Sequence, residues 1–295
     1  MLISQRLEKL ATHRTDAAGA VARFLLEDAT HAETLSMRQI AEATVTSKPT
    51  LVRVAQQLGY SGWRDFFDAW RLELAMQRER MGTVNHSLPF AAGATTREIA
   101  DAVARVASES AWQTSRIQDA RQIERAAELL AAAPVIALFG ISVNELCLRL
   151  FQRKMMQLGV RTHLSPQAEM GLFCQTLGAG DCAVVVSYTG ETADRTPMRH
   201  VETMRERGVR IISISGEGSN YLREHADAAL TIFSQESLYA KIGTFSTETS
   251  INTVLDILYA CYFARNYERN LARKMEISAA VEHNRQPRPD EATAR

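Results

Sequence analysis

In the first 80 residues, apolar side chains recur at intervals of three and four, which is the period of a helix that buries one face. The clearest case is the row formed by Phe66, Phe67, Trp70 and Leu74. The pattern predicts an all-helical region, with helical stretches at about residues 7–25, 37–43, 47–58 and 63–81.

From about residue 97 the pattern changes to short continuous apolar runs that alternate with helical stretches. Strand–helix–strand repeats of this size indicate a parallel sheet with helices on both faces, so we predict a doubly wound, five-stranded α/β domain. The predicted strands are 135–139, 160–164, 182–187, 209–214 and 228–232. The predicted helices are 97–118, 120–132, 144–158, 167–177, 192–207, 219–225 and a long one from 247 to about 274.

The two patterns are separated by a stretch that contains Gly82, Pro89 and Gly93 and has no helical period. We therefore predict a helical domain at 1–81, a linker at 82–96 and the α/β domain at 97–281. The polar residues 282–295, with two prolines, are predicted to be a disordered tail.

Charge and cysteine content restrict the partners and the compartment. The chain has 34 Lys and Arg against 34 Asp and Glu, so any surface for nucleic acid must be local. No window is apolar enough for a membrane span and no signal peptide is evident, so we expect no membrane partner. The four cysteines form no C-x-x-C pair, which favours free thiols in a reducing cytoplasm.

A local basic cluster lies in the helical region. Residues 47–64 contain three basic and no acidic side chains, and the two short helices at 37–43 and 47–58 have the spacing of a helix-turn-helix. In that motif the second helix enters the major groove by its N-terminal end, where Ser47 is well placed as the cap. The predicted DNA contacts are Ser47, Lys48, Thr50, Arg53 and Arg64. A helical dimerisation bundle with an incidental charge cluster fits the same pattern.

A second cluster is the hydroxyl-rich segment Ser187-Tyr188-Thr189-Gly190-Glu191-Thr192, which follows a buried strand. If this loop opens into a helix, its backbone amides and the helix dipole face one point, and hydroxyl groups add donors. Such a loop suits a phosphate group. We see no residue cluster that requires a metal or a cofactor.

The helical region resembles the DNA-binding domain of the RpiR family of bacterial transcription regulators. That family typically shows Ser-x-x-Thr-Val-x-Arg, followed by Leu-Gly-aromatic-x-Gly-aromatic. The matching residues are Ser47-Lys48-Pro49-Thr50-Leu51-Val52-Arg53 and Leu58-Gly59-Tyr60-Ser61-Gly62-Trp63. The family's turn usually carries Gly-Val, whereas this chain has Val45-Thr46. A β-branched residue disfavours positive φ, so we expect a turn of different shape.

Residues 120–270 resemble a SIS (sugar isomerase) domain, which RpiR regulators carry in this position. The matching segments are Phe139-Gly140-Ile141-Ser142, the 187–192 segment, Ile212-Ser213-Ile214-Ser215 and His225-Ala226-Asp227. The resemblance implies that Ser187, Thr189 and Thr192, with Gly190 between them, hold the phosphate of a phosphosugar. It also implies that Ser142 or Asn144 closes the other side.

Three further observations bear on this site. The first loop usually reads Gly-x-Gly-x-Ser, but here Ser142 stands where the second glycine would be, which restricts how closely the backbone approaches a ligand. Pro197 predicts that regular helix begins only near Thr196. Glu248, at the start of the last helix, is a candidate contact for a sugar hydroxyl.

We therefore expect a transcription regulator, not an enzyme, that binds operator DNA and a phosphorylated sugar as a homodimer or tetramer. The alternative is a phosphosugar isomerase with an appended helical domain, since carboxylates and histidines that could move protons are present. No pair of them has a spacing that requires catalysis. A third possibility is an inhibitor that binds a metabolic enzyme through the helical region.

Overall fold

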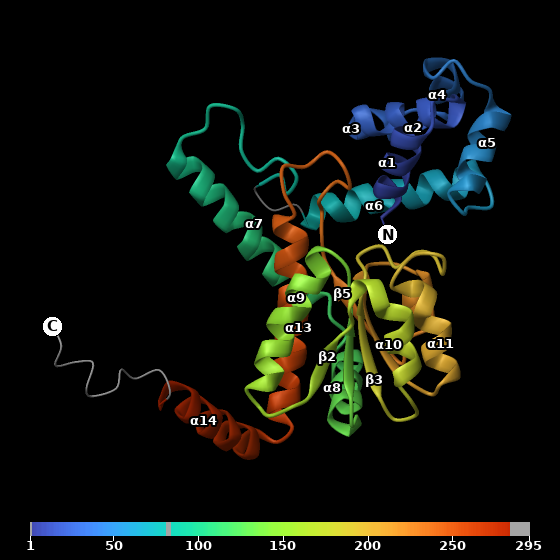
Figure 1. Cartoon of the computed structure of the whole chain (residues 1–295). Coiled ribbons are helices and arrows are strands. Elements are labelled where there is room, and N and C mark those ends of the chain that lie inside the picture. The colour runs from blue at the N-terminus through green and yellow to red at the C-terminus, as the bar shows by residue number, and fades with distance from the viewer. Residues whose placement is uncertain (1, 81–83, 284–295) are drawn as a thin grey trace. The chain divides into compact units, whose positions relative to one another are not determined.

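A computed structural model describes residues 2–80 and 84–283 of the chain (Figure 1). These residues form two compact units. The first unit holds the residues up to Gln113 together with Gly216–Gly218 and Phe233–Thr249, and the second holds Thr114–Ser215, Ser219–Ile232 and the residues from Ser250 on. The predicted boundaries at 81, 96 and 281 stay a prediction, and the predicted tail lies outside the described residues from 284 on.

The first 80 residues are helical, as predicted, and we call residues 3–80 the helical head. Its helices are α1 (Ile3–His13), α2 (Ala17–Glu27), α3 (Ala29–Ala32), α4 (Met37–Ala43), α5 (Lys48–Gln57) and α6 (Trp63–Arg80). Side-chain caps define where helices begin: Asp16 accepts from backbone amides of α2, Ser36 from α4 and Ser47 from α5. The buried core includes Leu7, Val21, Leu25, Ile40, Leu51, Phe66 and Trp70.

The second unit contains a five-stranded sheet in the order β2-β1-β3-β4-β5, which confirms the predicted α/β fold. The strands are β1 (Ile136–Phe139), β2 (Thr162–Leu164), β3 (Cys182–Val186), β4 (Arg210–Gly216) and β5 (Ala228–Ile232). β1 pairs in parallel with both β2 and β3, and β3 pairs in parallel with β4. β2 and β3 lie on opposite sides of β1 in the sheet, so the loops that follow β1 and β3 lie at a switch point, where ligands bind in such folds.

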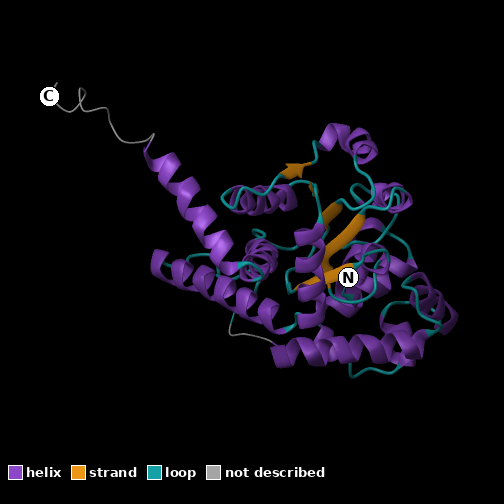
Figure 2. Cartoon of the chain, turned by 90° about the horizontal axis from the view of Figure 1, so that it is seen from below, coloured by secondary structure: helices purple, strands orange, loops and turns teal. Residues whose placement is uncertain are grey.

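Alternate strand residues face two separate cores. Ile136 and Leu138 belong to the core shared with α8 (Ala120–Ala132), α9 (Val143–Met156) and α13 (Phe245–Ala264). Ala137 and Phe139 belong to the core shared with α10 (Met170–Thr176) and α11 (Val201–Glu206). Figure 2 shows helices around the strands in the view from below. Burial on both faces explains why the strands are continuous apolar runs.

The remaining helices are α7 (Thr96–Arg116), η1 (Gln167–Glu169), η2 (Met198–His200), α12 (Tyr221–Glu224) and α14 (Tyr267–His283). Both α7 and α13 contribute residues to each unit. None of the helices within the described ranges is long and apolar enough to cross a membrane.

One predicted helix is wrong in its extent. The helix expected from 247 to about 274 is interrupted, because α13 ends at Ala264 and α14 begins at Tyr267. The break coincides with a side-chain contact, since the Asn270 amide donates to the carbonyl of Phe263 over 3.0 Å. A side chain that competes for a backbone carbonyl favours the end of a helix. α14 also extends to His283, beyond the predicted start of the tail.

Candidate functional site

The loop after β3 is organised around Ser187. This residue ends the buried run of β3, is only 8% exposed, and its backbone amide donates to Ile214 of β4 over 3.0 Å. Its Oγ accepts the backbone amide of Gly190 over 3.2 Å, and a hydroxyl that accepts can still donate one further hydrogen bond. Ser187 therefore shapes the loop and presents a donor at the end of the strand.

Gly190 takes a backbone conformation that only glycine adopts easily, with φ of +56°. A Cβ placed here would lie 2.4 Å from Oδ1 of Asn220. The carbonyl of Gly190 accepts the amide of Leu222 over 3.0 Å, so the loop rests on the start of α12. Glycine is therefore required at this position, because of the positive φ and because Asn220 leaves no room for a Cβ.

Asn220 supports this loop and was not among the predicted site residues. It is 7% exposed, caps α12 by accepting from the amide of Arg223, and donates to Ser215 Oγ over 3.1 Å. An asparagine directly before a short helix is typical of an N-cap, and this is the signal by which the sequence could have identified Asn220. Its packing against Gly190 depends on the tertiary structure.

The loop after β1 reaches the same edge of the sheet. The Asn144 amide donates to the carbonyl of Val186, the last residue of β3, over 3.4 Å. The structure therefore brings Asn144 next to the Ser187 loop, and its role as a ligand residue stays a prediction. Ser142 is exposed and its φ is +54°, so the serine adopts the angle of the glycine it replaces.

The loop after β3 does not open directly into a helix, contrary to the expected helix over 192–207. Residues 190–196 are loop and turn, and the next helical residues are those of η2 and α11. Pro197 accounts for this, because proline disfavours helical angles at the preceding residue. Anion binding here would rest on hydroxyls and amides without a helix dipole.

The other predicted ligand residues differ in their setting. Thr189 is half-buried within the loop, whereas Thr192 is exposed beyond it. Glu248 lies in the first turn of α13, accepts a hydrogen bond from Thr244 Oγ1, and belongs to the first compact unit. Its role as a ligand residue stays a prediction.

A cavity of about 440 Å³ lies in the first unit, and one of about 740 Å³ lies at the end of β2. The second is lined by polar side chains that the sequence reading did not assign to the site, among them Glu145, Arg149, His163 and Gln167. Hydrogen bonds from Gln167, and then from Arg149, lower the pKa of Glu145, so this carboxylate stays ionised. In the described ranges no group of His, Cys, Asp and Glu could hold a metal ion.

The predicted DNA contacts are gathered at the start of α5, with one exception. Ser47, Lys48 and Arg53 are exposed and Thr50 is partly exposed, while Leu51 is fully buried in the core of the helical head. The backbone amide of Thr50 donates to Ser47 Oγ over 3.4 Å, which confirms the predicted cap. Arg64 is also exposed but comes from α6, where it pairs with Asp68.

The turn between α4 and α5 keeps the left-handed conformation despite its β-branched residue. Val45 has φ of +51° and donates to the Glu42 carbonyl over 3.1 Å, while Thr46 donates to the Ala41 carbonyl over 2.8 Å. This pair of bonds is the Schellman ending of a helix. The expectation of a turn of different shape is therefore wrong: Val45 carries the strain instead.

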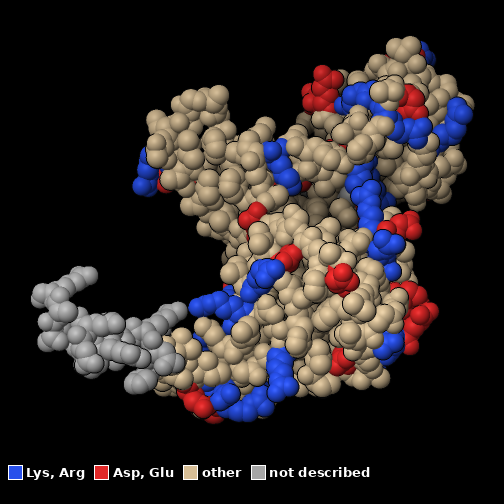
Figure 3. Space-filling view, in the orientation of Figure 1, with Lys and Arg blue, Asp and Glu red and all other residues tan. Residues whose placement is uncertain are grey.

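Arg14 was missed by the sequence reading. It lies before α2, forms an ion pair with Asp16, and lines a concavity of about 290 Å³ together with Thr50 and Arg53 of α5. Because Arg14 lies far from α5 in the sequence, no local pattern predicts that the two line the same concavity. On the face drawn in Figure 3, basic and acidic side chains are interspersed, as expected for a chain with 34 of each kind.

Two family models match this chain. Residues 1–77 match the helix-turn-helix domain of the RpiR family, and residues 129–260 match the SIS domain. An uncharacterised HTH-type transcriptional regulator of Caldanaerobacter subterraneus is 22% identical over 285 residues, which cover 93% of this chain and 95% of the relative.

Solved structures share the fold. The NanR protein of Vibrio vulnificus, complexed with ManNAc-6P, matches with a TM-score of 0.60 at 19% identity, over 97% of this chain and all of that one. The sugar isomerase domain of an RpiR transcription factor from Sphaerobacter thermophilus matches with a TM-score of 0.53 at 19% identity, over 62% of this chain and 99% of that one.

A putative sugar-phosphate isomerase of Listeria monocytogenes also shares the fold, with a TM-score of 0.51 at 13% identity, over 59% of this chain and 93% of that one. The fold of the second half therefore occurs in enzymes as well as in regulators. It is the helix-turn-helix in front of it that distinguishes this chain, which belongs to the RpiR family of transcription regulators and carries a SIS domain after the helix-turn-helix.

Proposed function

We propose that this protein is a sequence-specific, DNA-binding transcription regulator whose affinity for its operator is controlled by a phosphorylated sugar. The sugar phosphate binds at the loops after β1 and β3, and the N-terminal end of α5 reads the DNA. Two copies of the chain pair, so that two α5 helices contact the half-sites of a near-palindrome.

The observation that carries this proposal is the junction of Ser187, Gly190 and Asn144 at the switch point of the sheet. Ser187 and Gly190 share a hydrogen bond of 3.2 Å, and Asn144 reaches Val186 over 3.4 Å. The Ser187 hydroxyl and the Asn144 side-chain amide supply hydrogen-bond donors there, and such donors suit a tetrahedral anion.

Regulation is favoured over catalysis by the surroundings of the candidate proton carriers. An isomerase needs a base beside the sugar carbons. His225 is hydrogen bonded to the carbonyl of Tyr221 over 2.7 Å, and His163 faces the cavity beside β2. Burial lowers the pKa of His200, and the imidazole ring lies against Gly171 of α10, 3.4 Å from where a Cβ on that residue would stand.

The test measures DNA binding and sugar binding on the same protein. The DNA is a duplex selected by the wild-type protein from a random-sequence pool, and the sugars are glucose 6-phosphate, ribose 5-phosphate and N-acetylmannosamine 6-phosphate. We expect one of the sugar phosphates to bind by calorimetry and to change the Kd for DNA at least about fivefold. The double variant S187A/T189A should lose sugar binding and keep DNA binding.

The matched control is T176A, since the Thr176 hydroxyl is exposed at the end of α10 and donates to the carbonyl of Phe173 in the same helix. Equal sugar affinity in S187A/T189A and wild type contradicts the proposed site. Turnover of any of the sugar phosphates by the purified protein contradicts the regulator and favours the isomerase.

A further inference from the structure

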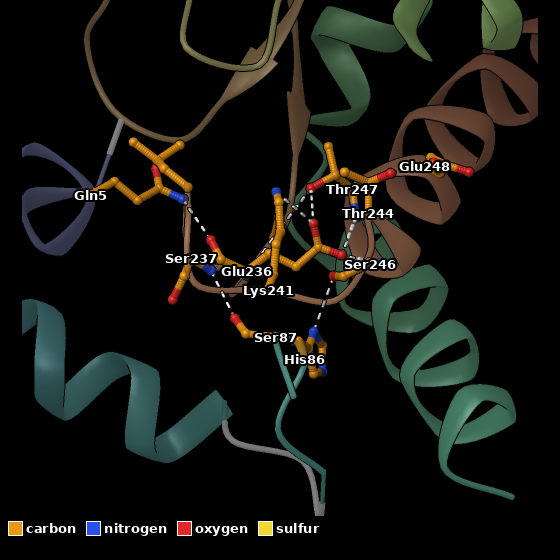
Figure 4. A network of polar contacts seen from close by, with 12 residues as sticks. Gln5, His86, Ser87, Glu236, Ser237, Lys241, Thr244, Ser246, Thr247 and Glu248 are labelled. Atoms are coloured by element: carbon orange, nitrogen blue, oxygen red, sulfur yellow. Dashed lines mark hydrogen bonds and ion pairs between the residues drawn. The ribbon is translucent and has the colours of Figure 1, made fainter. Parts of the chain in front are cut away.

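A buried carboxylate, Glu236, lies in the segment Phe233–Thr249 that leads from β5 to α13. The residue is 2% exposed, and its neighbours are polar (Figure 4). All the residues of this network belong to the first compact unit. Burying a carboxylate costs free energy, because the charge loses its contact with water, unless hydrogen bonds or a cation compensate for that loss.

The side chain of Glu236 caps α13 from a distance in sequence. One carboxylate oxygen accepts the backbone amides of Ser246 and Thr247, over 2.5 Å and 3.3 Å. Because α13 begins at Phe245, these amides belong to its first turn and have no acceptor within the helix. The other oxygen accepts from Thr247 Oγ1 over 2.7 Å and pairs with Lys241 over 3.3 Å.

The backbone of the same residue is held by the helical head. The Glu236 carbonyl accepts the side-chain amide of Gln5, in α1, over 3.1 Å. Gln5 is itself 2% exposed. Two residues later, the amide of Leu238 donates to the carboxylate of Glu8, also in α1, over 2.6 Å. Figure 4 shows Gln5 and Lys241 approaching Glu236 from different segments.

A second set of contacts fixes the same segment to residues 86–87. The Ser87 hydroxyl accepts the amide of Ser237 over 2.8 Å, and His86 Nδ1 lies 3.0 Å from Ser246 Oγ. Ser110 of α7 donates to the same Ser246 oxygen over 2.7 Å. The start of α13 is therefore held by several elements, and α1 contacts the same segment through Gln5, Glu8 and His13, whose Nε2 lies 3.1 Å from the Tyr239 hydroxyl.

We propose that Glu236 couples the position of α13 to α1, and that the Gln5 amide is the positioning contact through which the sugar site alters DNA affinity. This inference rests on the proposed function. α13 begins in the first unit and continues as the helix whose residues Ile251 and Leu255 lie in the core of the sheet. A shift of that helix moves its capped first turn, and Glu236 passes the shift to α1 by its carbonyl.

Allosteric coupling requires a contiguous element whose position depends on the occupancy of both sites. Here that element is α13 together with Glu236 and α1, between the proposed sugar site and the proposed DNA site. A purely apolar contact of similar volume would tolerate sliding. A hydrogen bond between one amide and one carbonyl is directional, so it distinguishes two positions of α13.

The test uses Q5M, which keeps the length of the side chain and removes the amide. The readout is the ratio of the Kd for the selected duplex with and without the sugar phosphate that binds the wild-type protein most tightly. We expect this ratio to fall from at least about fivefold to near one, while the Kd for the sugar phosphate alone and the Kd for DNA alone change less than about twofold.

The matched control is Q118M, because Gln118 makes an equivalent amide contact to the backbone of Thr231, over 2.7 Å, within the sheet unit. Loss of this hydrogen bond lowers the stability of the sheet unit, but it should leave the ratio of the two DNA Kd values as in wild type. E236Q serves as the second variant, since it removes the charge and keeps an acceptor, and its ratio should be reduced.

The outcomes separate the two proposals. A ratio in Q5M equal to that of wild type overturns the coupling and leaves the proposed function standing. A wild-type ratio of one overturns the proposed function and the coupling with it. If the ratio falls in Q118M as far as in Q5M, the fall results from lower stability of the protein, and the proposed coupling through Gln5 is wrong.

Discussion

Val45 and Ser142 are the two non-glycine residues with positive φ in the part of the chain that the structure describes. Each stands at a position where the family usually has glycine. Each also lies beside a predicted binding surface. Strain at such positions is maintained by the surrounding structure and is concentrated at functional sites. At the scale of single residues, Val45 and Ser142 therefore each add backbone strain, which lowers the stability of the folded protein.

We expect V45N to stabilise the protein. Val45 is 94% exposed, so it contributes no packing, and asparagine tolerates the left-handed conformation better than valine. The expected gain is about 1 kcal/mol in the free energy of unfolding, measured by urea denaturation with circular dichroism. The matched change is G59V, because Gly59 ends α5 with the same pair of hydrogen bonds at φ of +89°. A loss in V45N, or no loss in G59V, contradicts this reading of the turn.

A second residue-scale prediction concerns Gly190. Its replacement G190A places a Cβ at 2.4 Å from Asn220 Oδ1, so the loop must shift and sugar phosphate affinity should fall by about tenfold or more. The control is G180A, where φ is +93° but no atom lies within 4 Å of the added Cβ. The two variants share backbone strain and differ in the contact. Equal affinity in both, measured by calorimetry, argues against the packing of Gly190 on Asn220.

At the scale of elements, β3 is the middle strand of the sheet and is buried along its whole length. Its first residue, Cys182, lies in this low-dielectric interior. Burial raises the pKa of the Cys182 thiol to about 12, and the carboxylates of Asp227 and Asp181 act in the same direction. Because the thiolate is the reactive form, the thiol is inert while the sheet is intact.

We therefore expect Cys182 to react with DTNB at pH 8 only when the sheet opens. Labelling followed by peptide mass spectrometry should find Cys182 unmodified in the native protein and modified in concentrated urea. The half-buried Cys261 is the internal comparison, since its thiol is partly accessible, and C261S removes its signal. Rapid native labelling of Cys182 would show that β3 is not the stable centre of the sheet.

Sequence reasoning succeeded for elements whose signals are local. The caps at Ser47 and the apolar runs of the strands predicted α5 and the sheet, because helix starts and buried strands depend on neighbouring residues. The helix expected over 192–207 failed in its first half. Pro197 alone predicts a helix that begins near Thr196, and the first helical residues after the loop are those of η2, from Met198.

For the whole molecule, a net charge of zero means that DNA affinity must come from the local patch on the helical head. We expect R53A to weaken DNA binding and to reduce the slope of log K against log salt by about 0.9, the value for one phosphate contact, or to relax one base position. The control is R97A on α7, whose side chain is 85% exposed and pairs with Asp101. Titrations at several salt concentrations that give R53A the wild-type slope and affinity would remove Arg53 from the interface.

The sequence by itself determined the order of elements, the helix-turn-helix and the hydroxyl loop. Periodicity, caps and strand ends are set by residues close together in the chain, so they can be recognised before the tertiary structure is known. The family resemblance added the roles of the loop residues.

Only the tertiary structure decided that Asn220 lies behind Gly190, that Arg14 lies beside α5, and that Glu236 joins Gln5 to the start of α13. Gln5 and Glu236 are 231 residues apart, and no local pattern relates them. Their contact exists because two distant segments pack into one compact unit, where a buried carboxylate must find donors.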